Sequence, residues 1–300
     1  MPELPDVELY LSALRARIAG QTLERVRLAT PFLLRSVDPP LSAVEGRVVA
    51  GFRRIGKRIV WEMGDDLFLV FHLMIAGRFK WRDRGVATPK KVGLAAFDFA
   101  NGTVLVTEVA TQKRASLHVV RGEDALASFN PGGLEVMISD PGAFADALQK
   151  ESHTLKRALT DPHLFSGIGN AYSDEILHRA RLSPFKLTRH LTTDEIAVLH
   201  TATVETLAEW TARLQQHAGD TFPEKVTAFH EEMSVHGRFG KPCPRCGTAV
   251  QRIVHGEHEA NYCPACQTEG RLLADRALSK LLKDDWPRTL DELERRKRSG

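Results

Sequence analysis

The sequence lacks any apolar run long enough to cross a bilayer, which takes about 20 residues in a helix. Its first ten residues, MPELPDVELY, carry acidic side chains and lack the basic-then-apolar order of a secretory signal. These absences exclude a helical membrane protein, and no membrane partner is expected. They favour a cytoplasmic location.

Cysteine is scarce, and the four residues of this type all lie between positions 243 and 266. Small secreted domains spread cysteines through the chain, so this distribution is not typical of a disulfide scaffold. The net charge of +3 is also small, and charge alone identifies no nucleic-acid partner. One basic cluster, Arg53 to Arg58, is typical of an ordinary solvated face.

What the chain does contain is enough apolar residues, 43% of 300, for two or three modules with their own cores. Apolar spacing predicts a helix over about 6–19, ended by Gly20. The following segments are short, apolar and separated by turns, which predicts strands, with Asn101-Gly102 as a hairpin turn. The expected strands cover residues 48–55, 58–63, 67–75, 94–99, 103–109 and 115–120.

The second half is predicted to be helical. Helical spacing covers residues 142–151, 154–161, 171–182 and 193–217. Thr192 and Glu195 form a capping box ahead of the last helix. The fold class is therefore α+β: a two-layer β-sandwich with a leading helix, then a helical domain and a cysteine-rich hairpin.

Composition shifts and Pro-Gly turns predict five segments. They are a sandwich domain over 1–130, a hinge over 131–150, a helical domain over 151–234, a cysteine unit over 235–268 and a tail over 269–300. The tail contains the helical pattern LLADRALSKLLK, and we assign it no role.

The cysteines form two pairs, Cys243-x2-Cys246 and Cys263-x2-Cys266, separated by 16 residues. This spacing predicts one tetrahedral four-thiolate zinc site. Because four protein ligands leave no position for water, the zinc is expected to be structural. The alternative is four free or disulfide-bonded cysteines. The intervening segment has the character of a hairpin, which would suit a nucleic-acid groove.

Pro2 follows an initiator methionine that processing usually removes before a small residue. Removal leaves a secondary amine, and α-amino groups have a pKa of roughly 7.7–8.0, far below that of lysine. Such an amine can attack C1′ of a deoxyribose and form an iminium. Glu3 is placed beside it as a general acid or base. Alone, however, a proline at position 2 carries little information.

Four motifs occur in one order: MPELPDVELY, IGKRIV, GIGNAYSDEIL and VHGRFGKPCPRCG…YCPACQ. Together they resemble the formamidopyrimidine-DNA glycosylase and endonuclease VIII family over about residues 1–268. The resemblance implies a bifunctional DNA glycosylase/AP lyase of base-excision repair, with a sandwich, a helix–two-turn–helix domain and a zinc hairpin. Its expected partner is damaged double-stranded DNA, and it is expected to be a monomer. The expected location is that of a bacterial-type protein, in the cytoplasm and associated with the nucleoid.

The resemblance also implies residue roles. Pro2 is the Schiff-base nucleophile, Glu3 the proton donor, and Lys57 an acid assisting elimination that also contacts phosphate. The implied substrates are oxidised or ring-opened bases and abasic sites, flipped out of the duplex because C1′ cannot be reached within the stack. Further DNA contacts are implied for His72, Lys156 and Asn170, the last through its helix N-terminus.

The sequence departs from the family where the family contacts the lesion. Asp6 stands where glutamate is usual, and Leu94 where a DNA-contacting histidine is usual. Ile75, with Met74 beside it, occupies the position of the void-filling methionine. Residues 108–114 read EVATQKR in place of Asp-Pro-Arg-Arg-Phe, so the intercalating phenylalanine and its arginine are missing; Lys113 or Arg114 could substitute.

A second departure concerns the hairpin. His258 stands five residues before the third cysteine, where the family has an arginine that touches phosphate and assists δ-elimination. Arg252 lies on the same hairpin but six residues away, and both residues are expected to contact DNA. We therefore predict weak δ-elimination.

Two other functions fit parts of the sequence. The first is a DNA protein on this scaffold that binds lesions or abasic sites without excising bases. The second is a zinc-ribbon module for transcription or RNA, which leaves the first 230 residues unexplained. The presence of Pro2, Glu3 and Lys57 together favours the enzyme, because a binding protein gains nothing from that set.

Overall fold

The computed structural model describes residues 1–255, 258–274 and 287–299. They form two compact units, Met1–Gly133 with Ala208–Ala228, and Leu134–Leu207 with Phe229–Gly300. The predicted α+β class is confirmed: one unit holds two antiparallel sheets and a leading helix, and the other is helical with a cysteine-rich hairpin. No helix in the described ranges combines the length and the apolar character needed to span a bilayer.

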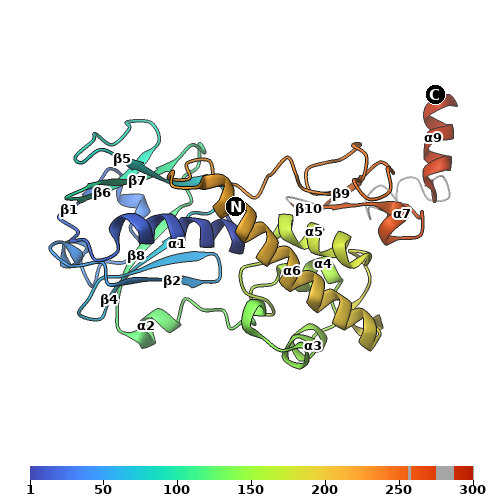
Figure 1. The fold of residues 1–300 in the computed structure, drawn as a ribbon, viewed down its shortest axis with the longest axis horizontal. Coiled ribbons are helices and arrows are strands. Elements are labelled where there is room, and N and C mark those ends of the chain that lie inside the picture. The colour runs from blue at the N-terminus through green and yellow to red at the C-terminus, as the bar shows by residue number, and fades with distance from the viewer. Residues whose placement is uncertain (256–257, 275–286, 300) are drawn as a thin grey trace. The chain divides into compact units, whose positions relative to one another are not determined.

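The first unit contains two four-stranded antiparallel sheets and the helices α1 and α2 (Figure 1). One sheet has the order β1-β6-β7-β5, formed by Arg25–Leu28, Gly93–Phe99, Gly102–Glu108 and Gly77–Arg82. The other has the order β2-β3-β4-β8, formed by Gly51–Ile55, Arg58–Glu62, Leu67–His72 and Ser116–Arg121. The other elements of its first segment, Met1–Gly133, are α1 (Leu4–Ile18), α2 (Glu123–Ala127) and the 3-10 turns Pro31–Leu33 and Leu41–Val44.

Aromatic side chains from both sheets meet in the core of the sandwich. The Trp61 ring lies 5.0 Å from Phe71 of its own sheet and 5.3 Å from Phe97 of the other. Phe71 also contacts Phe79 edge-on, with centroids 5.2 Å apart. All four side chains are fully buried, so this cluster holds the two layers together.

The first helix begins at Leu4, two residues before its predicted start. Pro5 falls in the first turn, where the missing N–H costs nothing. The helix ends at Ile18, and Gly20 follows in the left-handed region with φ 74°, as the predicted stop requires. Its apolar side packs against the sheet, with Val7, Leu14 and Ile18 completely buried.

The predicted hairpin at Asn101-Gly102 is present, with Gly102 as the first residue of β7 paired with Phe99. The two loop residues are thus Ala100 and Asn101. A Cβ atom on Gly102 would lie 2.2 Å from the Trp81 ring, so the indole occupies the space of a side chain. Glycine is therefore needed at position 102 because the Trp81 side chain of the neighbouring strand β5 packs against its backbone.

The second unit holds the predicted helices. They are α3 (Pro141–Gln149), α4 (Leu155–Thr160), α5 (Asn170–Ala180) and α6 (Thr193–Ala218), with 3-10 turns at Val136–Ile138 and Thr188–His190. The last part of α6, from Ala208, belongs to the first unit. The capping box is confirmed: the Thr192 N–H donates to Glu195 at 3.0 Å, and the Glu195 N–H donates to Thr192 Oγ1 at 3.2 Å.

The cysteine-rich part of this unit is a hairpin followed by a short helix. It consists of β9 (Gln251–His255), β10 (His258–Tyr262) and α7 (Pro264–Gln267). The chain ends in α9 (Leu290–Ser299). Most of the helical pattern predicted over 272–283 lies outside the described residues.

Candidate active site and DNA-contacting residues

The amino terminus of the chain is partly buried among charged side chains. Burial lowers the pKa of the Met1 amino group below its usual 8.0. The charged groups that act on this amine, two of each sign, are Glu3, Asp6, Arg78 and Lys57. Pro2, the next residue, is buried. The three residues predicted for catalysis, Pro2, Glu3 and Lys57, therefore come together in the fold.

Glu3 and Asp6 are fixed by the start of α1. Glu3 is the N-cap residue, and its backbone N–H donates to Asp6 Oδ2 at 2.8 Å. Both side chains are buried. A carboxylate in the first turn is also favoured by the helix dipole. Asp6, the shorter substitute for the usual glutamate, thus orders the backbone that carries Pro2 and Glu3.

His72 is the last residue of β4 and is followed by a turn. Its Nδ1 accepts the Met74 N–H at 3.2 Å. Burial, followed by the charges of Arg58, Lys57 and the amino terminus, lowers the pKa of His72 to about 4. The ring is therefore neutral at pH 7, with its proton on Nε2. It can still donate a hydrogen bond to a phosphate oxygen from that atom.

The turn after His72 exposes Ile75. Met74 adopts φ 52°, and a Cβ atom on Gly77 would lie 2.3 Å from the Leu73 carbonyl oxygen. Arg78 donates to the carbonyls of Ile75 and Gly77, at 3.0 and 2.6 Å. The side chain of Ile75 is 60% exposed, whereas Met74 is half-buried. Ile75 and Met74 are the two residues predicted to fill the space left by a flipped nucleotide. Of these two, Ile75 has the exposed side chain.

A second exposed apolar residue, Val109, was not predicted from the sequence. It is 76% exposed and follows Glu108, which pairs with Gly77 across β7 and β5. The buried Glu108 carboxylate accepts the backbone N–H groups of Arg114 and Ala115, at 3.0 and 3.2 Å. The loop from 109 to 114 is closed by this carboxylate and presents Val109 next to the Ile75 turn.

If Ile75 fills the space of a flipped nucleotide, Ile75→Ala weakens binding to a duplex containing an abasic-site analogue. Burial of such a side chain contributes about 1.5–3 kcal/mol, so we expect a loss of roughly tenfold or more. Binding to undamaged duplex should change little. Val48→Ala is the matched control, because Val48 is also exposed, at 46%, on the same unit and outside the residues proposed to contact DNA. Equal losses in the two variants would contradict the assignment.

Lys156 lies on α4 and reaches the start of α5. Its Nζ donates to the Asn170 carbonyl and to Asp174 Oδ1, the latter at 2.6 Å. Asn170 is the first residue of α5 and is half-exposed at the end of the glycine-rich turn. The fold therefore brings the predicted phosphate ligands Lys156 and Asn170 together at one helix N-terminus, a favourable location for an anion.

Asp174 and Glu175 connect α5 to the cysteine unit. Asp174 Oδ2 accepts from His236 Nδ1 at 2.8 Å and from Asn261 Nδ2 at 3.1 Å. Glu175 accepts three successive backbone N–H groups, those of residues 234–236, at 2.7, 2.9 and 3.0 Å. All these side chains are buried. Sequence reasoning missed this network, because its members are up to 87 residues apart.

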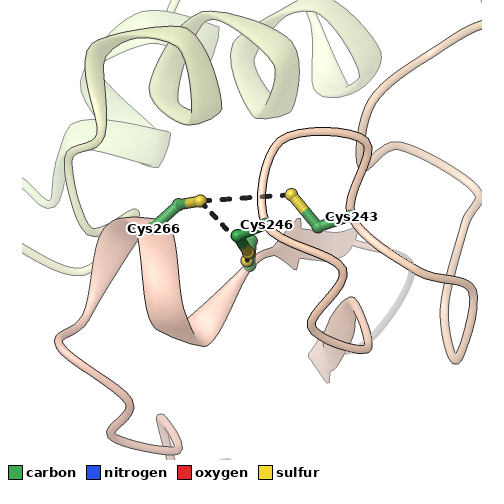
Figure 2. A group of neighbouring side chains, drawn as sticks. Cys243, Cys246 and Cys266 are labelled. Carbon is green, nitrogen blue, oxygen red and sulfur yellow. Dashed lines mark hydrogen bonds between the residues drawn. The ribbon is translucent and has the colours of Figure 1, made fainter.

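The four cysteine sulfurs converge as a tetrahedral metal site requires. They lie within 4.8 Å of one another, and Cys246 Sγ is 3.4 Å from Cys263 Sγ. Cys266 Sγ lies 3.5 Å from Cys246 Sγ and 4.0 Å from Cys243 Sγ (Figure 2). Zinc–sulfur bonds of about 2.3 Å place tetrahedral sulfurs about 3.8 Å apart. Burial raises the pKa of the Cys266 thiol to about 11, so a thiolate there needs a compensating cation. The residues fit one zinc ion.

His178 supports this site from α5. Its Nε2 lies 3.2 Å from Cys243 Sγ, and burial, with Arg245 and Arg181 nearby, lowers its pKa to about 4. A neutral ring facing a thiolate must carry its proton on Nε2 and donate it to sulfur. His178 thus holds a metal ligand in place and joins the cysteine unit to the helix.

Arg252 does not occupy the place of His258. In the hairpin register His258 pairs with His255, whereas Arg252 pairs with Asn261, three residue pairs away. At about 3.4 Å per residue this is about 10 Å along the strands. The Arg252 guanidinium stacks 5.0 Å from the Phe239 ring and lies 3.8 Å from Glu259. The backbone of His258 is in β10, but its side chain lies outside the described residues.

Comparisons with known proteins agree with this geometry. Three family models match: the formamidopyrimidine-DNA glycosylase N-terminal domain over residues 1–114, its H2TH domain over 136–218, and a zinc finger found in FPG and IleRS over 240–268. The formamidopyrimidine-DNA glycosylase of Thermus thermophilus is 33% identical over 283 residues, covering 90% of this chain and all of that protein. That of Exiguobacterium sibiricum is 30% identical over 279 residues, covering 89% and 99%.

Two solved structures are similar throughout. The Lactococcus lactis enzyme bound to DNA with an abasic site has a TM-score of 0.78 and 27% identity, covering 89% of this chain and 99% of that one. MutM in complex with DNA containing carbocyclic 8-oxo-G has a TM-score of 0.77, also at 27% identity, covering 89% and 100%. This chain belongs to the formamidopyrimidine-DNA glycosylase family. It is a DNA glycosylase of base-excision repair with a structural zinc finger.

Within the formamidopyrimidine-DNA glycosylase fold, one departure has a plain structural consequence. Leu94, which stands where the resemblance implies a DNA-contacting histidine, is buried in the sandwich on β6 and is 2% exposed. It cannot contact DNA from there.

Proposed function

We propose that this glycosylase also acts as an AP lyase, with the amine of Pro2 as its nucleophile. The observation that carries the proposal is the setting of the amino terminus, which is partly buried among Glu3, Asp6, Lys57 and Arg78. After removal of Met1 the secondary amine of Pro2 takes this setting. Burial lowers the pKa of an amine there, which leaves a reactive unprotonated fraction near neutral pH.

In the proposed reaction the Pro2 nitrogen bonds to C1′ of a nucleotide flipped out of the duplex. The base leaves C1′ with a proton supplied by the enzyme, and the Pro2 nitrogen loses its own proton. The C1′–O4′ bond then breaks as O4′ is protonated, which opens the sugar and gives an iminium between Pro2 and C1′. Loss of a proton from C2′ then expels the 3′ phosphate, which is β-elimination. Glu3, beside the nucleophile, is the proton donor and acceptor, and Lys57 neutralises the phosphate as it leaves.

The DNA is proposed to be held by residues on both units. On the first, Lys57 and the neutral His72 meet the backbone near the lesion, and Ile75 enters the space of the flipped nucleotide. On the second, Lys156, Asn170 and the zinc hairpin contact phosphates. Several similar structures hold DNA with abasic sites or oxidised bases, and we propose the same classes of substrate for this chain.

Borohydride trapping tests the proposal. The mature chain is mixed with duplexes containing an abasic site or a lesion, and borohydride reduces any iminium to a stable amine. We expect a covalent adduct that mass spectrometry places on the peptide beginning at Pro2. Binding without trapping on any duplex would instead favour a protein that recognises lesions and does not excise them.

We also predict that the second elimination is weak. The family arginine is replaced by His258, and Arg252 lies about 10 Å away along the hairpin and stacks on Phe239. A gel that resolves the two 3′ ends of nicked DNA should therefore show mainly the β-elimination product. His258→Arg should raise the share of 3′ phosphate, and Arg252→Gln should leave it unchanged. Mainly phosphate-ended product from the unmodified chain would contradict this prediction.

A further inference from the structure

The outer face of the second sheet carries a group of basic side chains that the proposed reaction does not use. The register pairs Ile59 with Phe71, which places Arg58 beside His72 on β4, and it pairs His118 with Val70, two residues before His72 on the same face. Arg35 is attached to the same strand, because its backbone N–H donates to the Leu117 carbonyl at 2.8 Å. We call Arg35, Arg58 and His118 the basic strip.

Arg58 and His118 are ordered by one aromatic ring. Arg58 Nη1 donates to the Phe129 carbonyl at 3.2 Å, and its guanidinium lies 5.8 Å from the Phe129 ring. The His118 ring meets the same phenylalanine edge-on, with centroids 4.9 Å apart. Arg58 is half-buried, and burial lowers its pKa. A cation held in a fixed position with part of its hydration removed attracts an anion more strongly than a freely exposed one.

The positive charge of the strip has no neutralising carboxylate within the part of the chain that the structure describes. Burial lowers the pKa of His118, and Arg58 and Arg35 lower it further. Among the described residues, no acidic group raises the pKa of His118 or His72. Other arginines of this unit form ion pairs with acids, and these are Arg27 with Asp98, Arg53 with Glu62 and Glu123, Arg82 with Glu224, and Arg84 with Glu24.

The strip is continuous with the proposed reaction site. The positive charges of Arg58, Lys57 and the amino terminus all lower the pKa of His72. A hollow of about 390 Å³ adjoins the strip and is lined by His118, Phe129 and Ser36, with Asp38 as its one acidic lining residue. Asp38 does not contribute to the shift of His118. Charged groups thus extend from the amino terminus along the sheet to Arg35.

We propose that the basic strip is a second DNA-backbone site, in which Arg58 and Arg35 each bind a phosphodiester of the duplex beyond the phosphate held by Lys57. Arginine presents a planar fork of donors that suits phosphate oxygens. The neutral His118 donates a hydrogen bond but adds no charge. This inference rests on the proposed function in one respect only, that the chain binds duplex DNA at the Lys57 side.

The salt dependence of binding tests the strip without any chemistry. Each phosphate neutralised contributes about −0.9 to the slope of log K against log salt. We expect Arg35→Gln to reduce the slope by about 0.9, and affinity by roughly eightfold at 0.1 M salt, on damaged and undamaged duplex alike. Arg84→Gln, an exposed arginine already paired with Glu24, should leave the slope unchanged. Arg35 is exposed, so this substitution does not threaten the fold.

Arg58 is tested by Arg58→Gln and Arg58→Lys, with thermal unfolding as the check on folding. Arg58→Gln should reduce the slope by about 0.9 relative to the unmodified chain, and Arg58→Lys should keep the slope of the unmodified chain. Phosphate-ethylation interference on the wild type should show one phosphate whose effect disappears in Arg35→Gln. An unchanged slope in Arg35→Gln would overturn the proposal, as would Arg35-dependent binding of inorganic phosphate with no change on DNA. Trapping at Pro2 is measured separately, so its failure leaves this result interpretable.

Discussion

Retention of Met1 should abolish trapping of the chain on abasic DNA and lower strand cleavage at least about 100-fold. The proposed nucleophile is the secondary amine of Pro2, and an extra residue turns that amine into an amide. The new amine of Met1 lies one residue, about 3.8 Å, further along the chain. A misplacement of only 1 Å can cost about 100-fold in rate, so this amine cannot replace the original.

The control uses the same preparation. Chain produced with methionine aminopeptidase inhibited keeps Met1, and treatment of this material with the peptidase exposes Pro2. Trapping and cleavage should return in proportion to the Met1 removed, while binding to undamaged duplex stays constant. Equal trapping before and after treatment would show that a different amine forms the adduct.

The rate of borohydride trapping at Pro2 should increase with pH. Burial lowers the pKa of the amino terminus below its usual 8.0, against the opposing charges of Glu3 and Asp6. The amine must be unprotonated to attack, so the trapping rate should rise with pH and level off above the amine pKa. That midpoint is expected to lie below the pKa of the same secondary amine in a free peptide that begins Pro-Glu. A midpoint at or above the peptide value would show that the carboxylates outweigh burial around Pro2.

The strands that sequence analysis missed are the two edges of one sheet. β1 reads RVRL and β5 reads GRFKWR, and each has basic residues at alternate positions. An edge strand needs only one apolar face, and charges at its exposed positions prevent pairing with other chains. The central strands are buried on both faces and read as continuous apolar runs, such as LFLVFH in β4, which is why they were predicted.

The features of the candidate site also differ in how far apart in the sequence their residues lie, and this decides which of them could be predicted. The cysteine spacing, the Thr192 capping box and the glycine-rich turn are local patterns, and each predicted its structure. The link from Asp174 to His236 and Asn261, and the meeting of Arg58 with His118, depend on how distant segments pack. Arg58 looked like part of an ordinary solvated cluster in the sequence, and only the register of the sheet separates it from Arg53, which is paired with acids.

Removal of zinc should unfold the cysteine unit and weaken DNA binding at α5 as well. Apparent zinc-binding free energies in finger peptides are about 10–16 kcal/mol, so most of the order in such a unit depends on the metal. Here the unit is joined to α5 by buried bonds: His178 to Cys243, Glu175 to the backbone of 234–236, and Asp174 to His236. Loss of the metal leaves these carboxylates buried with fewer partners.

The expected effect reaches Lys156, because Asp174 holds both Lys156 and His236. Loss of two or three charge-assisted hydrogen bonds of about 1.5–3 kcal/mol each lowers DNA affinity by roughly 100-fold or more. The measurement is binding to undamaged duplex after treatment with 1,10-phenanthroline, with the non-chelating 1,7 isomer as control. Re-addition of Zn²⁺ should restore binding, and Mg²⁺, which prefers oxygen ligands, should not.

Cys263→Ser repeats the test without a chelator, since Cys263 is fully buried at the centre of the site. Hydrogen exchange then separates two outcomes. If the cysteine unit alone is affected, only amides of about 235–268 lose protection and α5 stays protected. If the buried carboxylates transmit the change, amides of α5 lose protection too, and Lys156→Gln adds little further loss of affinity. The second outcome is expected, because Asp174 and Glu175 lie between the metal site and the phosphate-binding turn and have no solvent to replace their lost partners.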